Sequence, residues 1–183
     1  MDTVLEAENN IYLTNAKKED AKSVFDLYQE DMAELKKVFS FVNEDLTLED
    51  EESFFENPGK DHPFVIRFNN EICGYAVLYD FKDSNKSVSI LYYVNSRFRG
   101  NGIASIATTR LLDYAFEDLE ANKVDFFINT DNINSLKLVR RLGIRYEGTL
   151  LDNDYSNGEY KDQDLYSILK REYDFNFNKK RVL

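Results

Sequence analysis

The chain has 183 residues, 43% of them hydrophobic, which is enough for one domain with a substantial core. We therefore expect a single domain over residues 1–183. Its 34 acidic residues against 23 lysines and arginines leave a formal net charge of -11, which disfavours nucleic acids and anionic membranes as partners and favours cationic substrates. The same charge can also serve solubility alone.

The cysteine content and the first residues of the chain bear on the expected cellular compartment. Cys73 is the only cysteine, so no internal disulfide can form, and its apolar surroundings from Ile72 to Leu78 predict a buried, reduced thiol. Met1 to Thr3 open no signal peptide, and no apolar run approaches about 18 residues. We expect a cytoplasmic protein without a membrane segment.

The first third of the chain predicts a short strand followed by helices. The strand is Ile11 to Leu13. Apolar residues at helical spacing then predict two helices or one broken helix, namely Ala21, Val24, Phe25, Tyr28, Met32, Leu35, Val38 and Phe39. Thr47 to Asp50 has the form of a capping box, which starts a further helix that runs through Glu56 and ends at Asn57-Pro58-Gly59.

Acidic residues crowd this last helix, and two interpretations stay open. Glu49 to Glu52, together with Glu56, could flank a pocket for a cationic amine, or they could form a solvated helix face, which is the commoner case. His62 lies between Asp61 and Pro63 without a second ligand at metal spacing, so we expect it to be structural or exposed. No metal site is predicted.

The middle of the chain predicts antiparallel strands. Phe64 to Phe68 and Ile72 to Tyr79 form a hairpin around Asn69-Asn70-Glu71, and the polar stretch from Asp80 to Ser87 is expected to be a loop. Val88 to Val94 is the next strand. With the strand near the chain start, these make four antiparallel strands.

A strand, a tight turn and a helix follow one another around Arg97-Phe98-Arg99-Gly100-Asn101-Gly102-Ile103-Ala104. The helix is amphipathic, about five turns long, and runs to Ala121. Its first backbone N–H groups are unpaired and carry the positive end of the helix dipole, while Gly100 and Gly102 let a ligand approach closely and take a positive φ if the turn needs it. The segment predicts a phosphate or pyrophosphate site, against the alternative of an ordinary glycine turn.

A second strand-and-helix unit follows this long helix. Its strand, Val124 to Ile128, runs parallel to Val88–Val94 because a helix separates the two. Asp131 or Asn132 caps the next helix, and Gly143 ends it. The two closing strands are roughly Tyr146 to Leu151 and Tyr160 to Leu169.

The glycine turn lacks the lysine of a P-loop, and Ser105 stands where a dinucleotide fingerprint needs a third glycine. A third pattern fits: Arg or Gln, two residues, Gly, one residue, and Gly or Ala, placed between a strand and a helix. Arg97, Gly100 and Gly102 meet it. The segment resembles the coenzyme A loop of the GNAT superfamily of N-acetyltransferases.

Three further segments resemble the same superfamily. Asn132 to Ile144 is similar to its N-x-x-S…L-G-F segment and is followed by Glu147-Gly148. Tyr155 to Asp162 and Tyr166 to Leu169 resemble the closing hairpin of one subgroup, the ribosomal-protein N-terminal (RimJ/RimL-type) acetyltransferases. The likeness covers roughly residues 10–173. It implies an α/β (α+β) fold with a mixed, mostly antiparallel sheet of about seven strands, a central splayed parallel pair, and about four flanking helices.

The resemblance also implies a site for acetyl-CoA. Its pyrophosphate would bind the amides of Arg99 to Ala104, its pantetheine would pair with backbone groups of Tyr93 and Val94, and Asn132 and Ser135 would face the thiol. The side chains of two arginines would add charge. The full set implied is Tyr93, Val94, Arg97, Arg99, Gly100, Asn101, Gly102, Ile103, Ala104, Asn132 and Ser135.

The chemistry that the resemblance implies is acetyl transfer to a primary amine by direct attack, which needs a base for the amine proton and an acid for the thiolate. Val139 stands where many members have a tyrosine acid, so Ser135 is the candidate acid, with helix capping as its alternative role. Ser89 stands where the subgroup often carries a glutamate base. The base is unassigned, and a water relay, the Asp80–Asp83 loop and the Thr47–Glu56 helix are the candidates.

Two functions stay open at this stage. One is an acetyl-CoA-dependent N-acetyltransferase for a protein N-terminal amine or a small amine such as a polyamine. The other is a non-catalytic coenzyme A binding or regulatory module, favoured by the missing tyrosine and glutamate. Tyr92, Tyr155 and Tyr160 are expected in the core or at the rim. An exposed strand of the closing hairpin could pair across a homodimer.

Overall fold

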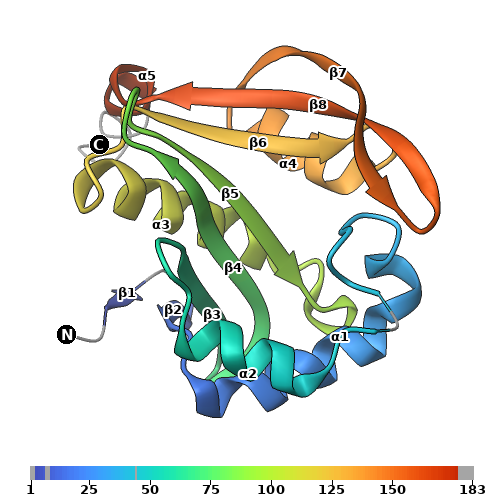
Figure 1. Ribbon diagram of the computed structural model, residues 1–183. Helices are drawn as coiled ribbons and strands as arrows, with labels where there is room; N and C mark the ends of the chain where they lie inside the picture. The colour runs from blue at the N-terminus through green and yellow to red at the C-terminus, as the bar shows by residue number, and fades with distance from the viewer. Residues whose placement is uncertain (1–2, 7–8, 44, 177–183) are drawn as a thin grey trace.

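The computed structural model describes residues 3–6, 9–43 and 45–176, so the remaining parts of the expected single domain lie outside the described residues. The described strands form one mixed sheet in the order β1-β2-β3-β4-β5-β6-β8-β7 (Figure 1). The strands are β1 (Val4–Glu6), β2 (Ile11–Asn15), β3 (His62–Phe68), β4 (Glu71–Lys82), β5 (Ser87–Val94), β6 (Lys123–Asn129), β7 (Arg145–Ser156) and β8 (Glu159–Leu169). The α-helices are α1 (Ala21–Leu35), α2 (Leu48–Glu56), α3 (Ile103–Glu117), α4 (Ile133–Arg141) and α5 (Lys170–Asn176).

The splayed parallel pair at the centre of the sheet is confirmed. β5 and β6 pair in parallel only from Ser87–Ser89 against Lys123–Asp125, while their other neighbours are antiparallel. Beyond that short contact β5 continues to Val94 and β6 to Asn129. A gap therefore opens between the carboxyl ends of the two strands.

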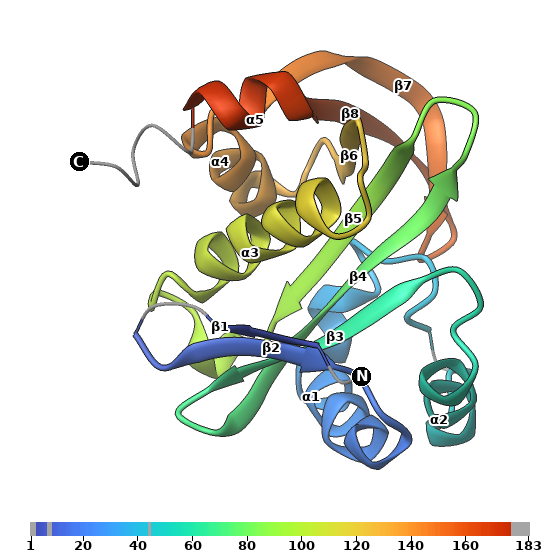
Figure 2. The same ribbon diagram turned by 90° about the vertical axis from the view of Figure 1, so that its left-hand side faces the viewer.

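Helices cover both faces of the sheet (Figure 2). α3, α4 and α5 pack on one face, and α1 and α2 pack on the other. Alternate residues of β5 consequently enter different cores: Val88 and Ile90 join the α3 side, whereas Leu91 and Tyr93 join the α1 side. Burial of apolar surface on both faces is the main stabilising contribution.

The sheet has one strand more, and the fold one helix more, than the sequence indicated. β1 has three residues, too few for a hydrophobic period, and forms by pairing with β2. α5 follows β8 without a loop, and its Glu172 accepts a hydrogen bond from the Leu169 amide at 2.9 Å. β1 depends on pairing with a distant strand, and α5 depends on its local cap and on the packing of Tyr173 against Phe116 of α3.

Several predicted boundaries were wrong. The segment over residues 21–39 is one helix that ends at Leu35, and α3 ends at Glu117 after 15 residues rather than five turns. β4 runs through Lys82 and β7 through Ser156, so polar stretches expected to be loops are strand. Both extensions contain register shifts, which accommodate the polar residues there. No helix among the described residues is long and apolar enough to cross a membrane.

Candidate functional site

The glycine turn at the start of α3 has an open main chain. Gly100 and Gly102 adopt φ angles of +85° and +74°, a conformation that residues with side chains rarely take. In the part of the chain that the structure describes, no acceptor engages the amides of Gly100 to Ala104. These N–H groups lie at the positive end of the α3 dipole, an arrangement that suits a phosphate or a diphosphate.

The two arginines of this turn pair with carboxylates of α1. Arg97 Nε lies 3.0 Å from Glu30 Oε2, and Arg99 Nη1 lies 2.8 Å from Glu34 Oε2. The resemblance implies that both side chains support the pyrophosphate. Because carboxylates already neutralise them, the main-chain amides supply more of the attraction for an anion than the sequence suggested.

A buried carboxylate of α1 is hydrogen-bonded to the segment that leads into the glycine turn. Asp31 Oδ2 accepts hydrogen bonds from the Tyr93 hydroxyl at 2.8 Å and from the Ser96 amide at 2.7 Å. Burial raises the pKa of Asp31, but the bonds from Ser96 and Tyr93 and the charge of Arg99 outweigh burial and hold this pKa below its ordinary value. The Tyr93 side chain therefore has a structural role.

The backbone groups that face the gap belong to Tyr92 and Val94. The Asn95 amide donates to a β4 carbonyl at 2.9 Å, so the trans peptide turns the Val94 carbonyl the opposite way, toward the gap. Tyr93 faces β4 instead, and a Cβ built on Gly74 would lie 2.2 Å from its carbonyl oxygen. Of the expected pair, Val94 therefore turns its backbone groups toward the gap and Tyr93 does not, whereas Tyr92 does.

Two hollows meet at this gap. One, of about 820 Å³, lies beside the glycine turn, and we call it the turn hollow. The other, of about 670 Å³, lies on the face covered by α1 and α2, and we call it the α2 cavity. Two cations of α4 that the sequence analysis missed, Lys137 and Arg141, line the turn hollow. The residues that border both hollows are Val38, Phe39, Tyr92, Asn132 and Ser135.

A tyrosine and a serine lie where the hollows meet. Asn132 caps α4 by accepting a hydrogen bond from the Ser135 amide at 3.2 Å, which leaves the Ser135 hydroxyl out of the cap. The Tyr92 hydroxyl is buried and makes no hydrogen bond of normal geometry to a described residue, although the Ser135 hydroxyl is close enough to affect its pKa. Burial raises the pKa of Tyr92 to about 12, and the Ser135 hydroxyl opposes that rise. A phenol that stays protonated can give a proton to a thiolate.

Tyr92 was expected in the core or at the rim, and the structure places it at the junction. The sequence shows that residue 92 alternates with its neighbours between the two faces of the strand. It does not show where β5 and β6 separate. Val139, the position where many relatives have a tyrosine, is fully buried in the α3 core. Of the residues that border both hollows, Tyr92 is the one with a phenol.

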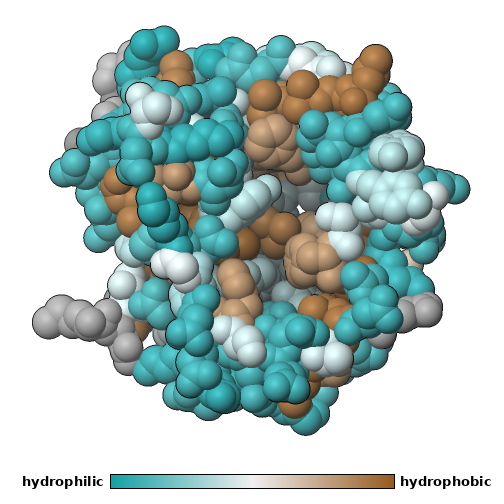
Figure 3. All heavy atoms as spheres, viewed as in Figure 1, coloured by the Kyte–Doolittle hydropathy of each residue, from teal (hydrophilic) through white to brown (hydrophobic). Residues whose placement is uncertain are grey.

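The α2 cavity has apolar walls and one buried acid. Figure 3 shows apolar side chains gathered toward the middle of this face. Glu51 is only 6% exposed, and its Oε1 atom has no hydrogen-bond partner among the described residues. Burial raises the pKa of Glu51 to about 7, although the Tyr28 hydroxyl opposes part of that rise. The apolar and aromatic lining residues include Phe39, Phe41, Leu46, Phe54, Tyr75, Val77, Tyr79 and Leu91.

The other acids considered as bases are either paired or less buried than Glu51. Asp50 completes the predicted capping box, where its Oδ2 accepts from the Thr47 amide at 2.9 Å. Asp80 lies 3.1 Å from the Lys82 ammonium group at the exposed edge of the sheet. Of the acids in the expected base segments, Glu51 alone combines deep burial with an unpaired oxygen.

The remaining candidates from the sequence are structural. Among the described residues, no group of three or more His, Cys, Asp or Glu side chains could hold a metal ion. His62 is half-buried at the start of β3, and its Nδ1 lies 3.3 Å from the Tyr114 hydroxyl. Cys73 is fully buried and free, which confirms the predicted buried thiol, and burial raises its pKa to about 12.

Comparison with known proteins identifies related sequences. Residues 10–145 match the family described as "Acetyltransferase (GNAT) domain". YdaF of Bacillus subtilis (strain 168), named as a ribosomal N-acetyltransferase, is 35% identical over 109 residues, which is 60% of each chain. A spermidine N(1)-acetyltransferase of Escherichia coli (strain K12) is 24% identical over 110 residues, covering 60% of this chain and 59% of its own length. The chain thus matches less than two thirds of either relative.

Solved structures share the fold. RimL, a ribosomal L7/L12 alpha-N-protein acetyltransferase in complex with coenzyme A, has a TM-score of 0.84 at 20% identity and covers 91% of this chain and 98% of its own. Mycobacterium smegmatis RimJ, in complex with a CoA-disulfide, has a TM-score of 0.84 at 22% identity, with 93% and 88% covered. Because the family match extends over well more than half of its residues, the chain belongs to the GNAT acetyltransferase domain family.

Proposed function

We propose that the protein transfers an acetyl group from acetyl-CoA to a primary amine, either a protein N-terminal amine or a small amine such as a polyamine. One observation carries the proposal. The free amides of Gly100 to Ala104 open onto a hollow that joins a second cavity at Tyr92 and Ser135. Relatives named as ribosomal and spermidine acetyltransferases support this class of reaction.

The turn hollow suits the cofactor. The amides of Gly100 to Ala104 would hold the diphosphate, with Lys137 and Arg141 as nearby cations. The backbone groups of Tyr92 and Val94 would pair with the pantetheine amides in the gap between β5 and β6. Structural neighbours bound to coenzyme A support this placement. The thioester would then lie at the junction with the α2 cavity.

The junction supplies groups for the acetyl transfer. A backbone N–H at the gap can stabilise the oxyanion that forms when the amine attacks the thioester carbonyl. Tyr92 is a stronger acid than the Ser135 alcohol, so the phenol would give its proton to the departing thiolate while Ser135 orients it. Ser135, the acid expected from the sequence, thereby becomes a positioning residue.

The test is a thiol-release assay with acetyl-CoA and a panel of amines and N-terminal peptides, combined with calorimetry of coenzyme A binding. Binding together with turnover of one amine class supports the proposal. Binding without turnover of any acceptor would instead favour the non-catalytic module that the absence of a tyrosine at Val139 suggests. An absence of binding would overturn the assignment of the turn hollow.

A further inference from the structure

Glu51 is buried in the α2 cavity beside the Tyr28 hydroxyl, and the described lining offers it no cationic partner. Its helix position accounts for the burial, because Glu51 and Phe55 share the inward face of α2 and Phe55 is 4% exposed. A carboxyl group taken out of water costs free energy unless it is paired, and most buried acids have a partner. Glu51 Oε1 has none among the described residues.

The groups that face Glu51 are phenols and acids. Tyr28 of α1 and Tyr75 of β4 lie against it, and burial raises the pKa of both well above the ordinary value, so both are neutral. The Tyr28 hydroxyl is likewise buried without a partner. Asp50 and Asp61 also line the cavity. Within the described lining of this cavity there is no lysine or arginine, so a cation is what Glu51 lacks.

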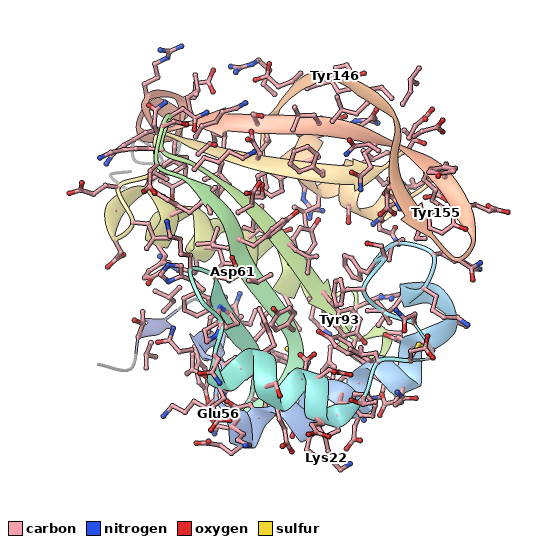
Figure 4. All side chains as sticks on the ribbon, viewed as in Figure 1. Lys22, Glu56, Asp61, Tyr93, Tyr146 and Tyr155 are labelled. Atoms are coloured by element: carbon pink, nitrogen blue, oxygen red, sulfur yellow. The ribbon has the colours of Figure 1, made fainter. Side chains whose placement is uncertain are left out.

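Glu51 lines the same cavity as Tyr92, and the Tyr28 ring beside it reaches the end of β5. The Tyr28 ring lies 6.5 Å from Tyr75 and 5.6 Å from Tyr93, two residues that are direct partners on β4 and β5. Figure 4 shows Tyr93 at the end of β5 beside α1. The preceding residue, Tyr92, borders both hollows. An amine that reaches the thioester through the α2 cavity therefore passes this carboxylate.

Resting on the proposed function, we propose that Glu51 binds the ammonium group of the acceptor in the α2 cavity and takes its first proton, and that the acceptor is a primary amine carried on an apolar or aromatic body. The freed nitrogen attacks the thioester carbon, forming the C–N bond, and the C–S bond breaks with its electron pair on sulfur. The nitrogen loses a second proton to solvent, and sulfur gains one from Tyr92. Once Glu51 and Tyr92 regain their starting states, each turnover releases one proton.

The walls of the cavity select the rest of the acceptor. Aromatic and aliphatic side chains form most of the lining, and they favour an apolar body next to the nitrogen. Asp50 and Asp80 are already bonded to Thr47 and Lys82. Asp154 accepts a hydrogen bond from Asn129, and Asp61 is only half-buried. The second ammonium group of a polyamine would therefore lose its water inside the cavity and gain at most a carboxylate that water also reaches, which favours that class less.

The test compares the wild type, Glu51→Gln and the control Glu49→Gln, which makes the same change at an exposed position of the same helix. Acetyl transfer to 2-phenylethylamine and to spermidine is followed across about pH 5.5 to 9. We expect kcat/KM for 2-phenylethylamine to exceed that for spermidine at least about tenfold. Glu51→Gln should lower kcat/KM at least about 100-fold and abolish its rise near neutral pH, while Glu49→Gln matches the wild type.

A second readout does not require turnover. The apparent pKa of the Glu51 carboxyl is followed by carbon-13 NMR with and without 2-phenylethylamine, and a bound ammonium group should lower it by about one unit or more. Unchanged coenzyme A binding by calorimetry shows that Glu51→Gln is folded.

The outcomes separate the two proposals. An active wild type with Glu51→Gln equal to Glu49→Gln overturns the role of Glu51, and faster transfer to spermidine overturns the acceptor class. A wild type that acetylates no amine overturns the proposed function, and the NMR titration still decides whether Glu51 binds the ammonium group. If neither amine changes the carboxyl pKa, the proposal that Glu51 binds the ammonium group is overturned.

Discussion

The glycine turn and the α2 cavity offer different kinds of groups to a ligand. The turn uses eight consecutive residues, Arg97 to Ala104, and offers main-chain amides whose direction depends on two glycines and a helix start. The α2 cavity collects side chains from α1, α2, β4, β5, β6 and the closing hairpin. A main-chain site tolerates most side-chain changes, whereas a side-chain cavity can be altered one residue at a time. Cofactor binding and acceptor choice are thereby carried by separate parts of the molecule.

Gly102→Val should have the largest effect on the turn. Valine at a φ of +74° is strained, and its branched side chain would stand in the path of the diphosphate, because no protein atom lies within 4 Å of an added Cβ. We expect coenzyme A affinity, measured by calorimetry, to fall at least about 100-fold, equivalent to roughly 3 kcal/mol. The control Gly158→Val introduces the same strain at a φ of +80° in the β7–β8 turn and should leave affinity unchanged. Equal losses in both variants would contradict the assignment.

Glu51→Gln tests the α2 cavity through the stability of the protein rather than through its activity. The pKa of Glu51 rises from 4.5 to about 7 on folding, so the stabilising effect of its proton is complete below about pH 4.5 and is lost as pH rises through 7. The variant removes this dependence. The free energy of unfolding is measured in urea for both proteins. The value for the variant minus the value for the wild type should increase by about 2 kcal/mol between pH 5.5 and pH 8.5. Glu49→Gln should show no such trend, and a flat difference for Glu51→Gln would place its carboxyl in contact with water.

The contrast between a local main-chain site and a cavity built from distant segments explains which features the sequence could predict. The glycines at 100 and 102, the capping box of Thr47 and Asp50, and the Asn132 cap are local signals, and each is confirmed in the structure. Glu51 carried the same local signal as Glu49, and the sequence favoured a solvated face for both. Only the packing of α2 against Tyr28 and Tyr75 separates a buried acid from an exposed one. Tyr92 was missed for the same reason, because the end of the β5–β6 pairing is a tertiary feature.

Tyr92→Phe tests the junction that the two regions share. Loss of the phenol should lower kcat about ten- to hundredfold while the affinity for coenzyme A stays the same, because the ring still packs. Ser135→Ala should reduce kcat less, by about three- to tenfold, since it removes only a neighbour that orients the phenol. Tyr155→Phe, on the exposed closing hairpin (Figure 4), is the matched control. A larger loss from Ser135→Ala than from Tyr92→Phe would restore the serine as the acid.

Asp31→Asn should have the smallest effect and tests whether the two regions are coupled, because α1 borders the α2 cavity and also holds the glycine turn through Asp31. The amide oxygen can still accept both hydrogen bonds but without the negative charge, so we expect the free energy of unfolding at pH 7 to fall by only about 1 kcal/mol and KM for acetyl-CoA to rise about two- to fivefold. The folded pKa of Asp31 is lowered, so its contribution is present above the ordinary carboxyl pKa and is lost as pH falls below it. Asp26→Asn, which breaks only the exposed pair with Lys22, should change stability by less than about 0.5 kcal/mol. A change in KM for the amine as large as that for acetyl-CoA would show that the turn and the cavity act as one unit.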